Sequence, residues 1–151
     1  MKRLFAGAAL ASLMGWAAAA AAQTWNEEFA PAPDNPLVGK WNWKASDGSC
    51  PSVFDYRADG TAAVTDGDEQ LELSYQLFVS RDMKLYKVVE TTRSSNGKPD
   101  CKGRVTELGR TSVHYVYQNA LGGYPTCVVR LITSDGKPLL ECYGFLTRSA
   151  Q

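Results

Sequence analysis

The chain has very few of the residues from which metal and catalytic centres are usually built. Its 151 residues include one histidine, His114, and they contain neither a Cys-x-x-Cys spacing nor a Gly-x-Ser-x-Gly motif. A zinc site draws on several cysteine or histidine ligands, and a serine hydrolase needs a marked nucleophile beside its histidine. We therefore expect no metal, no cofactor and no enzymatic activity.

Acidic side chains provide two further candidates for chemistry, and each has a simpler explanation. Asp55, Glu72 and Glu90 have the residue type of a glycosidase acid and base, but we expect them to point outward from strands. Residues 66–69, Asp-Gly-Asp-Glu, offer oxygen ligands of the kind that calcium takes. They lack the EF-hand pattern, so we expect a solvated hairpin turn there.

A long apolar run occurs only at the N-terminus. Met1-Lys2-Arg3 precedes uncharged residues 4–22, which end in a string of alanines. A basic start, an apolar centre and an Ala-x-Ala end predict a cleaved secretory signal peptide over residues 1–22. A retained membrane anchor is the alternative, but about 20 strongly apolar residues are needed to cross a bilayer, and about half of this run is alanine. We expect a periplasmic or secreted protein with no membrane span after cleavage.

Basic residues do not cluster anywhere in the chain. It has 16 Lys and Arg against 16 Asp and Glu, and two of the basic residues, Lys2 and Arg3, belong to the expected signal peptide. Fourteen basic residues then remain against 16 acidic ones. A small negative net charge without a basic patch argues against nucleic acid or an anionic membrane as a partner.

Four cysteines follow the expected cleavage site: Cys50, Cys101, Cys127 and Cys142. An even number in an exported chain predicts two disulfides, and four cysteines allow three pairings. We predict Cys50 with Cys101 and Cys127 with Cys142. With residues 134–135 as a two-residue hairpin loop, the antiparallel register places Cys127 opposite Cys142. A loop at residues 135–136 would shift that register by two and make this pair diagonal.

Short apolar-rich runs separated by turn dipeptides fill the rest of the chain. Residues 71–79, LELSYQLFV, alternate between apolar and polar side chains, and Asp-Gly and Asn-Gly dipeptides separate such runs. We expect an all-β, antiparallel up-and-down barrel of eight or nine strands, because closure hides strand edges. A two-sheet sandwich is the alternative. The predicted strands cover residues 38–45, 52–57, 61–65, 70–79, 83–93, 103–108, 112–118, 126–133 and 139–147.

The predicted organisation has three parts. Residues 1–22 form the signal peptide, and residues 23–36, with three prolines and no periodicity, form an extended arm that is neither strand nor helix. Residues 37–151 form one barrel domain. Within it, the turn-rich loop 94–103 contains Cys101, and we interpret it as a disulfide-stapled connection, with a binding element at the barrel mouth as the alternative.

Gly39-Lys40-Trp41 opens the first predicted barrel strand, close to the start of the mature chain. This Gly-x-Trp resembles the signature of the lipocalins and their calycin relatives, in particular small exported bacterial members. In that family the tryptophan lies at the closed end of the barrel, and an arginine near the end of the last strand packs over its ring. The resemblance implies a lipocalin-like barrel in which Arg148 covers Trp41.

An eight-stranded barrel either fills its interior with side chains or holds one small ligand. Large residues that we expect to point inward are the candidate ligand-binding residues: Trp41, Trp43, Tyr75, Leu77, Tyr115 and Tyr117. The alternative is that they simply pack against one another. Alternation along the strand places His114 on the face opposite Tyr115 and Tyr117, so we expect it to point outward.

Two functions follow from this reading. The first is a monomeric carrier that holds a small hydrophobic or amphipathic ligand inside the barrel. The alternative is a protein-binding module, such as an inhibitor of a periplasmic protease or hydrolase, that uses the barrel rim and the arm with Trp25 and Phe29 as anchors. An envelope protein with a purely structural role is a third possibility.

Overall fold

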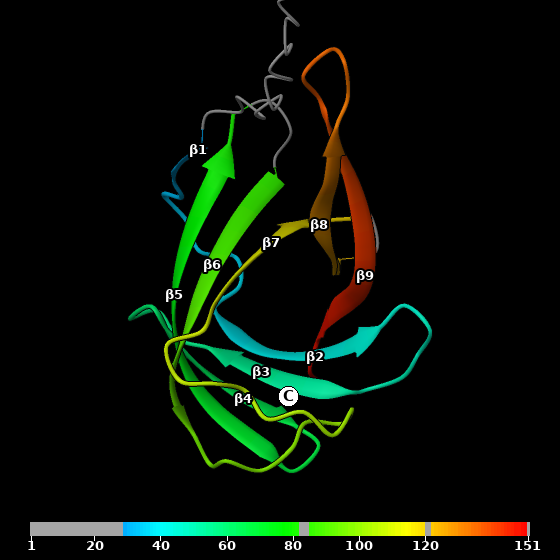
Figure 1. The fold of residues 1–151 in the computed structure, drawn as a ribbon. Helices are drawn as coiled ribbons and strands as arrows, with labels where there is room; N and C mark the ends of the chain where they lie inside the picture. The colour runs from blue at the N-terminus through cyan, green and yellow to red at the C-terminus, as the bar shows by residue number, and fades with distance from the viewer. Residues whose placement is uncertain (1–28, 82–84, 120–121, 151) are drawn as a thin grey trace, which may run out of the picture.

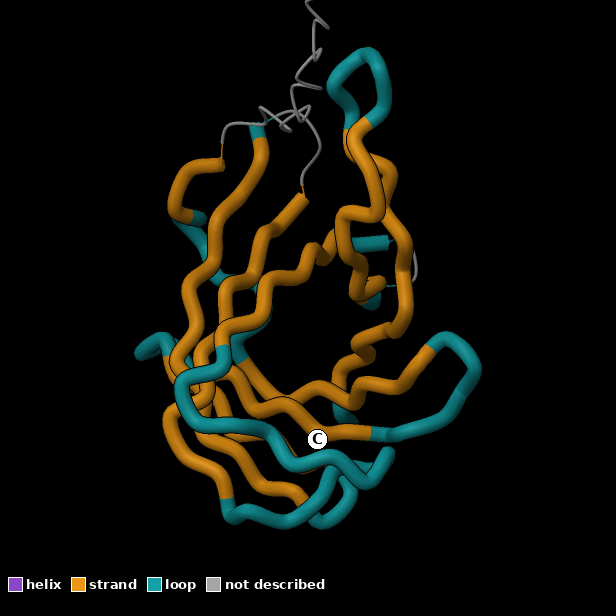
Figure 2. The backbone as a smooth tube through the Cα atoms, in the orientation of Figure 1, coloured by secondary structure: helices purple, strands orange, loops and turns teal. Residues whose placement is uncertain are grey.

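The computed structural model describes residues 29–81, 85–119 and 122–150. Over these ranges the chain forms strands and loops without a helix (Figure 1, Figure 2). The strands are β1 Phe29–Pro31, β2 Gly39–Ala45, β3 Ser52–Tyr56, β4 Thr61–Asp66, β5 Glu69–Ser80, β6 Leu85–Ser95, β7 Thr111–Tyr117, β8 Tyr124–Ile132 and β9 Pro138–Arg148. No part of these ranges has the helical length and hydropathy needed to span a membrane. The expected signal peptide and Trp25 lie outside the described residues.

Strands β2 to β9 form a closed antiparallel barrel. Each strand pairs with the next one along the chain, and β9 returns to pair with β2, with Arg148 opposite Trp41. The predicted all-β, antiparallel up-and-down barrel of eight or nine strands is therefore confirmed, and eight strands form the closed barrel. A sandwich is excluded, because the hydrogen-bonded ladder runs without interruption from β2 around to β9.

The ninth strand, β1, comes from the segment that we expected to be an extended arm without regular structure. Phe29–Pro31 pairs antiparallel with β5, with Phe29 opposite Ser80. The pairing of β4 with β5 ends at Ser74, so the remaining edge of β5 is free for another strand. Part of the arm is thus a strand, because an open edge offers hydrogen bonds that its own sequence pattern does not reveal.

The strand predicted over residues 103–108 is wrong. This segment belongs to the loop between β6 and β7, in which the Arg104 backbone N–H donates to the Asp100 carboxylate at 2.8 Å. The Thr106 backbone N–H donates to Glu69 Oε1 at 2.7 Å. Side-chain acceptors therefore take the backbone donors that a strand would have paired with a neighbouring strand.

The hairpin between β3 and β4 shows how a turn dipeptide reverses the chain. The Asp59 carboxylate accepts the backbone N–H of Thr61 at 3.0 Å, and Gly60 adopts a left-handed φ of +82°. Asp-Gly suits both requirements, because aspartate closes the turn with its own side chain and glycine has no Cβ to obstruct a positive φ.

Both predicted disulfides are present, Cys50–Cys101 and Cys127–Cys142. The β8–β9 hairpin nevertheless reaches its register by a different route from the two-residue loop that we expected. Its turn is closed by hydrogen bonds between Thr133 and Lys137, and a one-residue shift near Arg130 then brings Cys127 opposite Cys142. The pairing is correct, but a β-bulge sets it and not the loop length.

The hydrophobic core is densest at the end of the barrel that contains Trp41. Its buried members are Leu37, Trp41, Tyr56, Ala62, Val64, Leu73, Tyr75, Val88, Val116, Tyr124 and Leu146. The indole N–H of Trp41 donates to the Leu37 carbonyl at 2.6 Å, so the segment preceding β2 folds across this end. This end of the barrel is filled with side chains.

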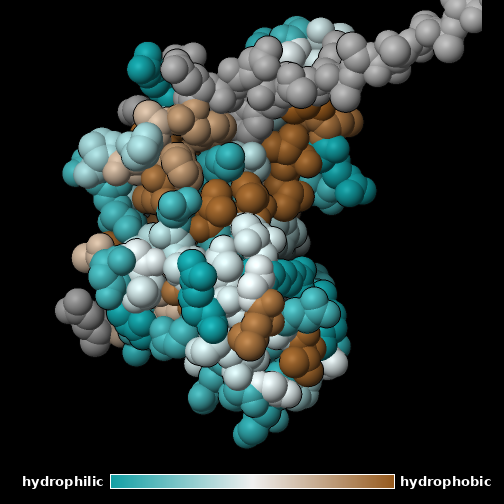
Figure 3. Space-filling view, turned by 60° about the vertical axis from the view of Figure 1, so that its left-hand side comes forward, coloured by the Kyte–Doolittle hydropathy of each residue, from teal (hydrophilic) through white to brown (hydrophobic). Residues whose placement is uncertain are grey.

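The outer surface of the barrel is not uniformly polar. The face seen in Figure 3 carries hydrophobic residues in its upper part and mostly hydrophilic ones below. Outward side chains of neighbouring strands form mixed contacts, in which the Lys87 ammonium lies 5.9 Å from the Phe78 ring centre and 5.8 Å from that of Phe29. The Phe29 ring also lies 5.9 Å from Tyr115, so β1 is fastened to the barrel by its side chain as well as by its backbone.

Candidate functional site

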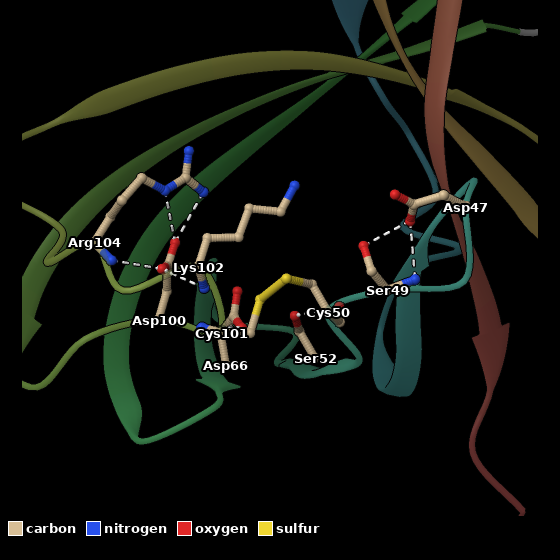
Figure 4. The surroundings of a disulfide bond; sticks show 9 residues. All are labelled: Asp47, Ser49, Cys50, Ser52, Asp66, Asp100, Cys101, Lys102 and Arg104. Atoms are coloured by element: carbon tan, nitrogen blue, oxygen red, sulfur yellow. Dashed lines mark hydrogen bonds and ion pairs between the residues drawn. A yellow bond between two sulfur atoms is a disulfide. The ribbon is translucent and has the colours of Figure 1, made fainter.

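The Cys50–Cys101 disulfide joins the β2–β3 loop to the β6–β7 loop at the end of the barrel opposite the core (Figure 4). Beside it, the Asp66 carboxylate accepts the backbone N–H of Cys101 at 3.2 Å. Arg104 forms a two-pronged ion pair with Asp100, at 2.8 and 3.0 Å. These contacts hold residues 100–104 in one conformation, so the interpretation of this loop as a stapled connection is supported by its geometry.

Glu69 attaches the same loop to the barrel. Its side chain is buried and accepts both the backbone N–H and the hydroxyl of Thr106, at 2.7 and 3.0 Å. A buried carboxylate with two hydrogen bonds is a strong tether, since losing either donor would leave one of its buried oxygens without that hydrogen bond. The expected solvated turn at residues 66–69 is therefore wrong for Glu69, the last of the four.

Two adjoining cavities of about 220 Å³ each lie between this loop and the core. They share four lining residues, Phe54, Asp66, Glu90 and Ser112. The first is further lined by residues of β2, β3, β7, β8 and β9, so it lies inside the barrel. The second extends beneath the β6–β7 loop, where Thr106 and Arg110 contribute to its wall.

Glu90 is the central polar group of the first cavity. It is 7% exposed, and Oε1 accepts the hydroxyl of Tyr56 at 2.7 Å. Its other oxygen, Oε2, lies 3.7 Å from Nδ1 of His114, which is beyond hydrogen-bonding distance. Burial, together with repulsion from Glu90, raises the pKa of Tyr56 well above its ordinary value, so Tyr56 remains a hydrogen-bond donor to Glu90.

An aromatic wall faces this carboxylate across the cavity. The Trp43 indole lies directly over Gly144, where the Cβ of any other residue would overlap the ring, and its N–H donates to the Thr126 hydroxyl at 3.2 Å. The Tyr143 ring lies 6.2 Å from that of Trp43. Glycine at position 144 is therefore required for the indole to lie flat against β9.

Tyr143 reaches the cavity because of a bulge. Thr126 pairs with Gly144 whereas Cys127 pairs with Cys142, so Tyr143 has no partner of its own on β8. An extra residue of this kind turns its side chain away from the regular alternation. Tyr143 is still 40% exposed, and its partial burial, followed by repulsion from Glu90, raises the pKa of Tyr143 to about 12.

The faces expected for β7 are wrong. His114 is 7% exposed and lines the first cavity, whereas Tyr115 and Tyr117 point to the outside of the barrel, where Tyr117 is 37% exposed. The outward direction expected for Glu90 is wrong for the same reason, since it pairs with Ser112 on the inward side of β7. Both faces of β7 carry large side chains, so alternation alone did not show which one the barrel would enclose.

The other candidate ligand-binding residues divide between the cavity and the core. Trp43 lines the first cavity. Trp41 and Tyr75 are buried in the core, where the Tyr75 hydroxyl accepts from Asn35 and donates to the Arg57 carbonyl, each at 2.6 Å, and Leu77 packs against that core. Glu90, His114 and Tyr143 complete the cavity site, and the one signal that marked them was their residue type, polar or titratable groups within apolar strands.

The pairing implied by the Gly-x-Trp motif is present in the structure. The Arg148 guanidinium lies over the Trp41 ring, 4.4 Å from its centre. The same guanidinium donates to the backbone carbonyl of Val38 at 2.9 Å. The motif therefore marks a structural contact at the filled end of the barrel, away from the cavity.

Comparisons with protein-family models, with curated proteins and with solved structures found no match to this chain. The structural class of this protein is therefore described from its own fold and cavity. It is a closed eight-stranded antiparallel barrel, compatible with a lipocalin-like fold, with one filled end and a polar, aromatic-lined cavity toward the other. Two disulfides indicate that it folds in an oxidising environment.

Proposed function

We propose that this protein is an exported lipocalin-like carrier that binds a small amphipathic molecule in the cavity lined by Trp43, Glu90 and His114. The observation that supports this most directly is the composition of the cavity wall, where aromatic rings surround a few convergent polar groups inside a closed barrel. That combination is typical of small-molecule sites, in which apolar surface supplies affinity and polar groups set orientation.

The size of the cavity limits the ligand. Each cavity measures about 220 Å³, below the roughly 300–1,000 Å³ of pockets for drug-sized molecules. A single aromatic ring with a short polar side chain fits this scale, whereas a long-chain fatty acid or haem does not. The carrier role is therefore proposed for compact amphipathic molecules with one polar end.

The alternative of a protein-binding module receives less support. It depends on an arm whose anchors insert into a partner, and Phe29, one of the two anchors, instead packs beside Tyr115 and beneath the Lys87 ammonium. Inserting Phe29 into a partner would require β1 to separate from β5. The cavity, in contrast, is already formed, and binding there does not require β1 to separate from β5.

Calorimetry of the mature protein with four compact probes tests the carrier proposal: 2-phenylethylamine, 2-phenylethanol, phenylacetate and hexanoate. At least one should bind saturably, with a Kd at or below about 1 mM. Binding should quench the fluorescence of Trp43, and Trp43→Phe should abolish that quenching. If no probe saturates below that limit, the carrier proposal is wrong.

A cavity-filling substitution locates the binding. Ser112 lines both cavities, so Ser112→Leu should weaken binding of any probe that the native protein binds. Thr147→Leu is the matched control, because Thr147 is exposed on another part of the barrel wall, strand β9, and lines neither cavity. Equal affinities for the two variants would place the ligand elsewhere.

A further inference from the structure

Two carboxylates line the first cavity, without a lysine or arginine of the described chain beside them. Its ionisable side chains, other than tyrosines, are Asp66, Glu90 and His114, and neither lysine nor arginine appears among its lining residues in the described ranges. Of the two cavities, only the second has lysine or arginine among its described lining residues, Arg104 and Arg110, and Arg104 is paired with Asp100. With His114 neutral, the formal charge of the first cavity therefore comes from carboxylates, which attract a cation and repel an anion.

Glu90 has one carboxylate oxygen that is open to the cavity and has no hydrogen-bond partner among the residues that the structure describes. One oxygen accepts from Tyr56, but the other lies 3.7 Å from the nearest His114 nitrogen, too far for a hydrogen bond. Removing a carboxylate from water is costly unless hydrogen bonds or an opposite charge replace the lost hydration. Because Glu90 lines the cavity, a ligand that enters it can supply both a donor to Oε2 and an opposite charge.

Four aromatic side chains line the same cavity as Glu90: Trp43, Phe54, Tyr56 and Tyr143. The Phe54 and Tyr56 rings stack at 5.7 Å, and the Trp43 and Tyr143 rings lie 6.2 Å apart at an angle of 57°. Aromatic faces carry negative electrostatic potential and attract ammonium groups, most strongly where water is excluded. Rings and carboxylate thus favour the same kind of ligand.

We propose that the natural ligand is a small protonated amine, with at least one N–H directed at Glu90 Oε2 and an apolar body against Trp43 and Tyr143. This inference rests on the proposed carrier function and specifies its ligand class. An N–H is required because Oε2 is a hydrogen-bond acceptor, so a primary, secondary or tertiary amine suits the site better than a quaternary one.

Three of the probes named above differ mainly in their polar end, and they test the sign of the charge. At neutral pH 2-phenylethylamine is a cation, 2-phenylethanol is neutral and phenylacetate is an anion. We expect the native protein to bind the amine about tenfold or more tighter than the alcohol, and the anion most weakly. This comparison needs no variant, so it does not depend on whether a substitution permits folding.

Glu90→Gln tests the assignment of the contact. The amide still accepts the Tyr56 hydroxyl but carries no charge, so affinity for 2-phenylethylamine should fall about tenfold or more while affinity for 2-phenylethanol changes less than about twofold. Glu141→Gln is the matched control, since Glu141 is exposed on β9, pairs with Arg130 and does not line the cavity. The control should bind both probes as the native protein does.

The outcomes separate the two proposals. If the native protein binds the alcohol or phenylacetate as tightly as the amine, the amine inference is overturned and the carrier function stands. If the amine is preferred but Glu90→Gln binds it with native affinity, the assignment to Glu90 is overturned. If neither these probes nor hexanoate binds, the carrier function fails and the inference fails with it.

Discussion

The Arg148 guanidinium lies 4.4 Å from the centre of the Trp41 ring, and the two residues face each other across the β2–β9 ladder that closes the barrel. The guanidinium also donates to the carbonyls of Val38 and Pro36, at 2.9 and 3.4 Å. One side chain therefore joins the last strand, the first barrel strand and the segment that covers the filled end. Closure of this barrel is stabilised at the point where its two ends meet.

Substitution of Arg148 should destabilise the fold, and alanine should be more destabilising than lysine. We expect Arg148→Ala to lower the free energy of unfolding by about 1–2 kcal/mol, and Arg148→Lys to lower it by less, because lysine keeps the charge but loses the planar fork. Urea unfolding followed by fluorescence measures both. Arg130→Ala removes a pair with Glu141 that is solvent-exposed on both sides, and should cost less than about 0.5 kcal/mol. If Arg148→Ala costs no more than this control, the contact is not stabilising.

Gly39→Ala should destabilise the folded protein, because the added methyl group would clash with the Arg148 guanidinium. Gly39 has a φ of +119°, and a Cβ at this position would lie 2.5 Å from Arg148 Nη1. A cost of about 1–3 kcal/mol is expected. Gly48→Ala is the matched control, because Gly48 has a φ of +79° and no atom within 4 Å of an added Cβ, so it carries only the conformational cost. In an Arg148→Ala background the cost of Gly39→Ala should decrease, and an unchanged cost would show that the two residues do not interact.

The two disulfides should contribute unequally to stability. Cys50–Cys101 closes a loop with a sequence separation of 51 and Cys127–Cys142 one of 15, which correspond to about 4 and about 3 kcal/mol on the chain-entropy account. Unfolding of the two double Cys→Ser variants in guanidinium chloride measures the difference. The first variant should also weaken probe binding, since the Cys50–Cys101 loop region lines the second cavity. Native probe affinity in that variant would show that the disulfide does not shape the site.

Stability should fall in alkaline solution as the tyrosines beside Glu90 begin to ionise. The pKa of Tyr143 is raised to about 12, and that of Tyr56 is raised well above its ordinary value of 10.0. The unfolded chain releases these protons near pH 10 while the folded protein retains them, so the stabilisation is complete below about pH 10 and is lost as the pH rises toward 12. Urea midpoints measured from about pH 8 to about pH 11 should decrease, and less steeply for Tyr143→Phe. Identical slopes for the variant and the native protein would contradict the raised pKa of Tyr143.

Much of the architecture follows from local patterns. Alternation in residues 71–79 and Asp-Gly turns such as Asp59-Gly60 predicted antiparallel strands, and the structure has them at these positions. The prediction of a strand at 103–108 failed because backbone donors of this segment bind the carboxylates of Asp100, a local acceptor, and of Glu69, which is 37 residues from Thr106 and lies outside any short window. Likewise, β1 exists only because β5 is longer than β4.

The cavity was much harder to predict than the barrel. On β7, Val113, Tyr115 and Tyr117 form the more apolar set, yet the buried residues are His114 and Val116, and Ser112 on the same side lines the cavity while remaining exposed. Alternation separates two faces without saying which one becomes the interior, and that choice depends on how the whole sheet curls. The Tyr143 bulge adds a second difficulty, since it breaks the alternation on which such a prediction relies.

The sequence alone predicted the all-β class, the number of strands to within one and the two disulfide pairs, and the resemblance of its Gly-x-Trp motif implied the Trp41–Arg148 contact. These depend on spacing along the chain, on turn chemistry and on a short motif, each of which is local or involves the two ends of the barrel. Only the tertiary structure decided that Glu90 and His114 lie inside with Tyr56, because the inward face of each strand is set by closure of the sheet, a property that all eight strands share.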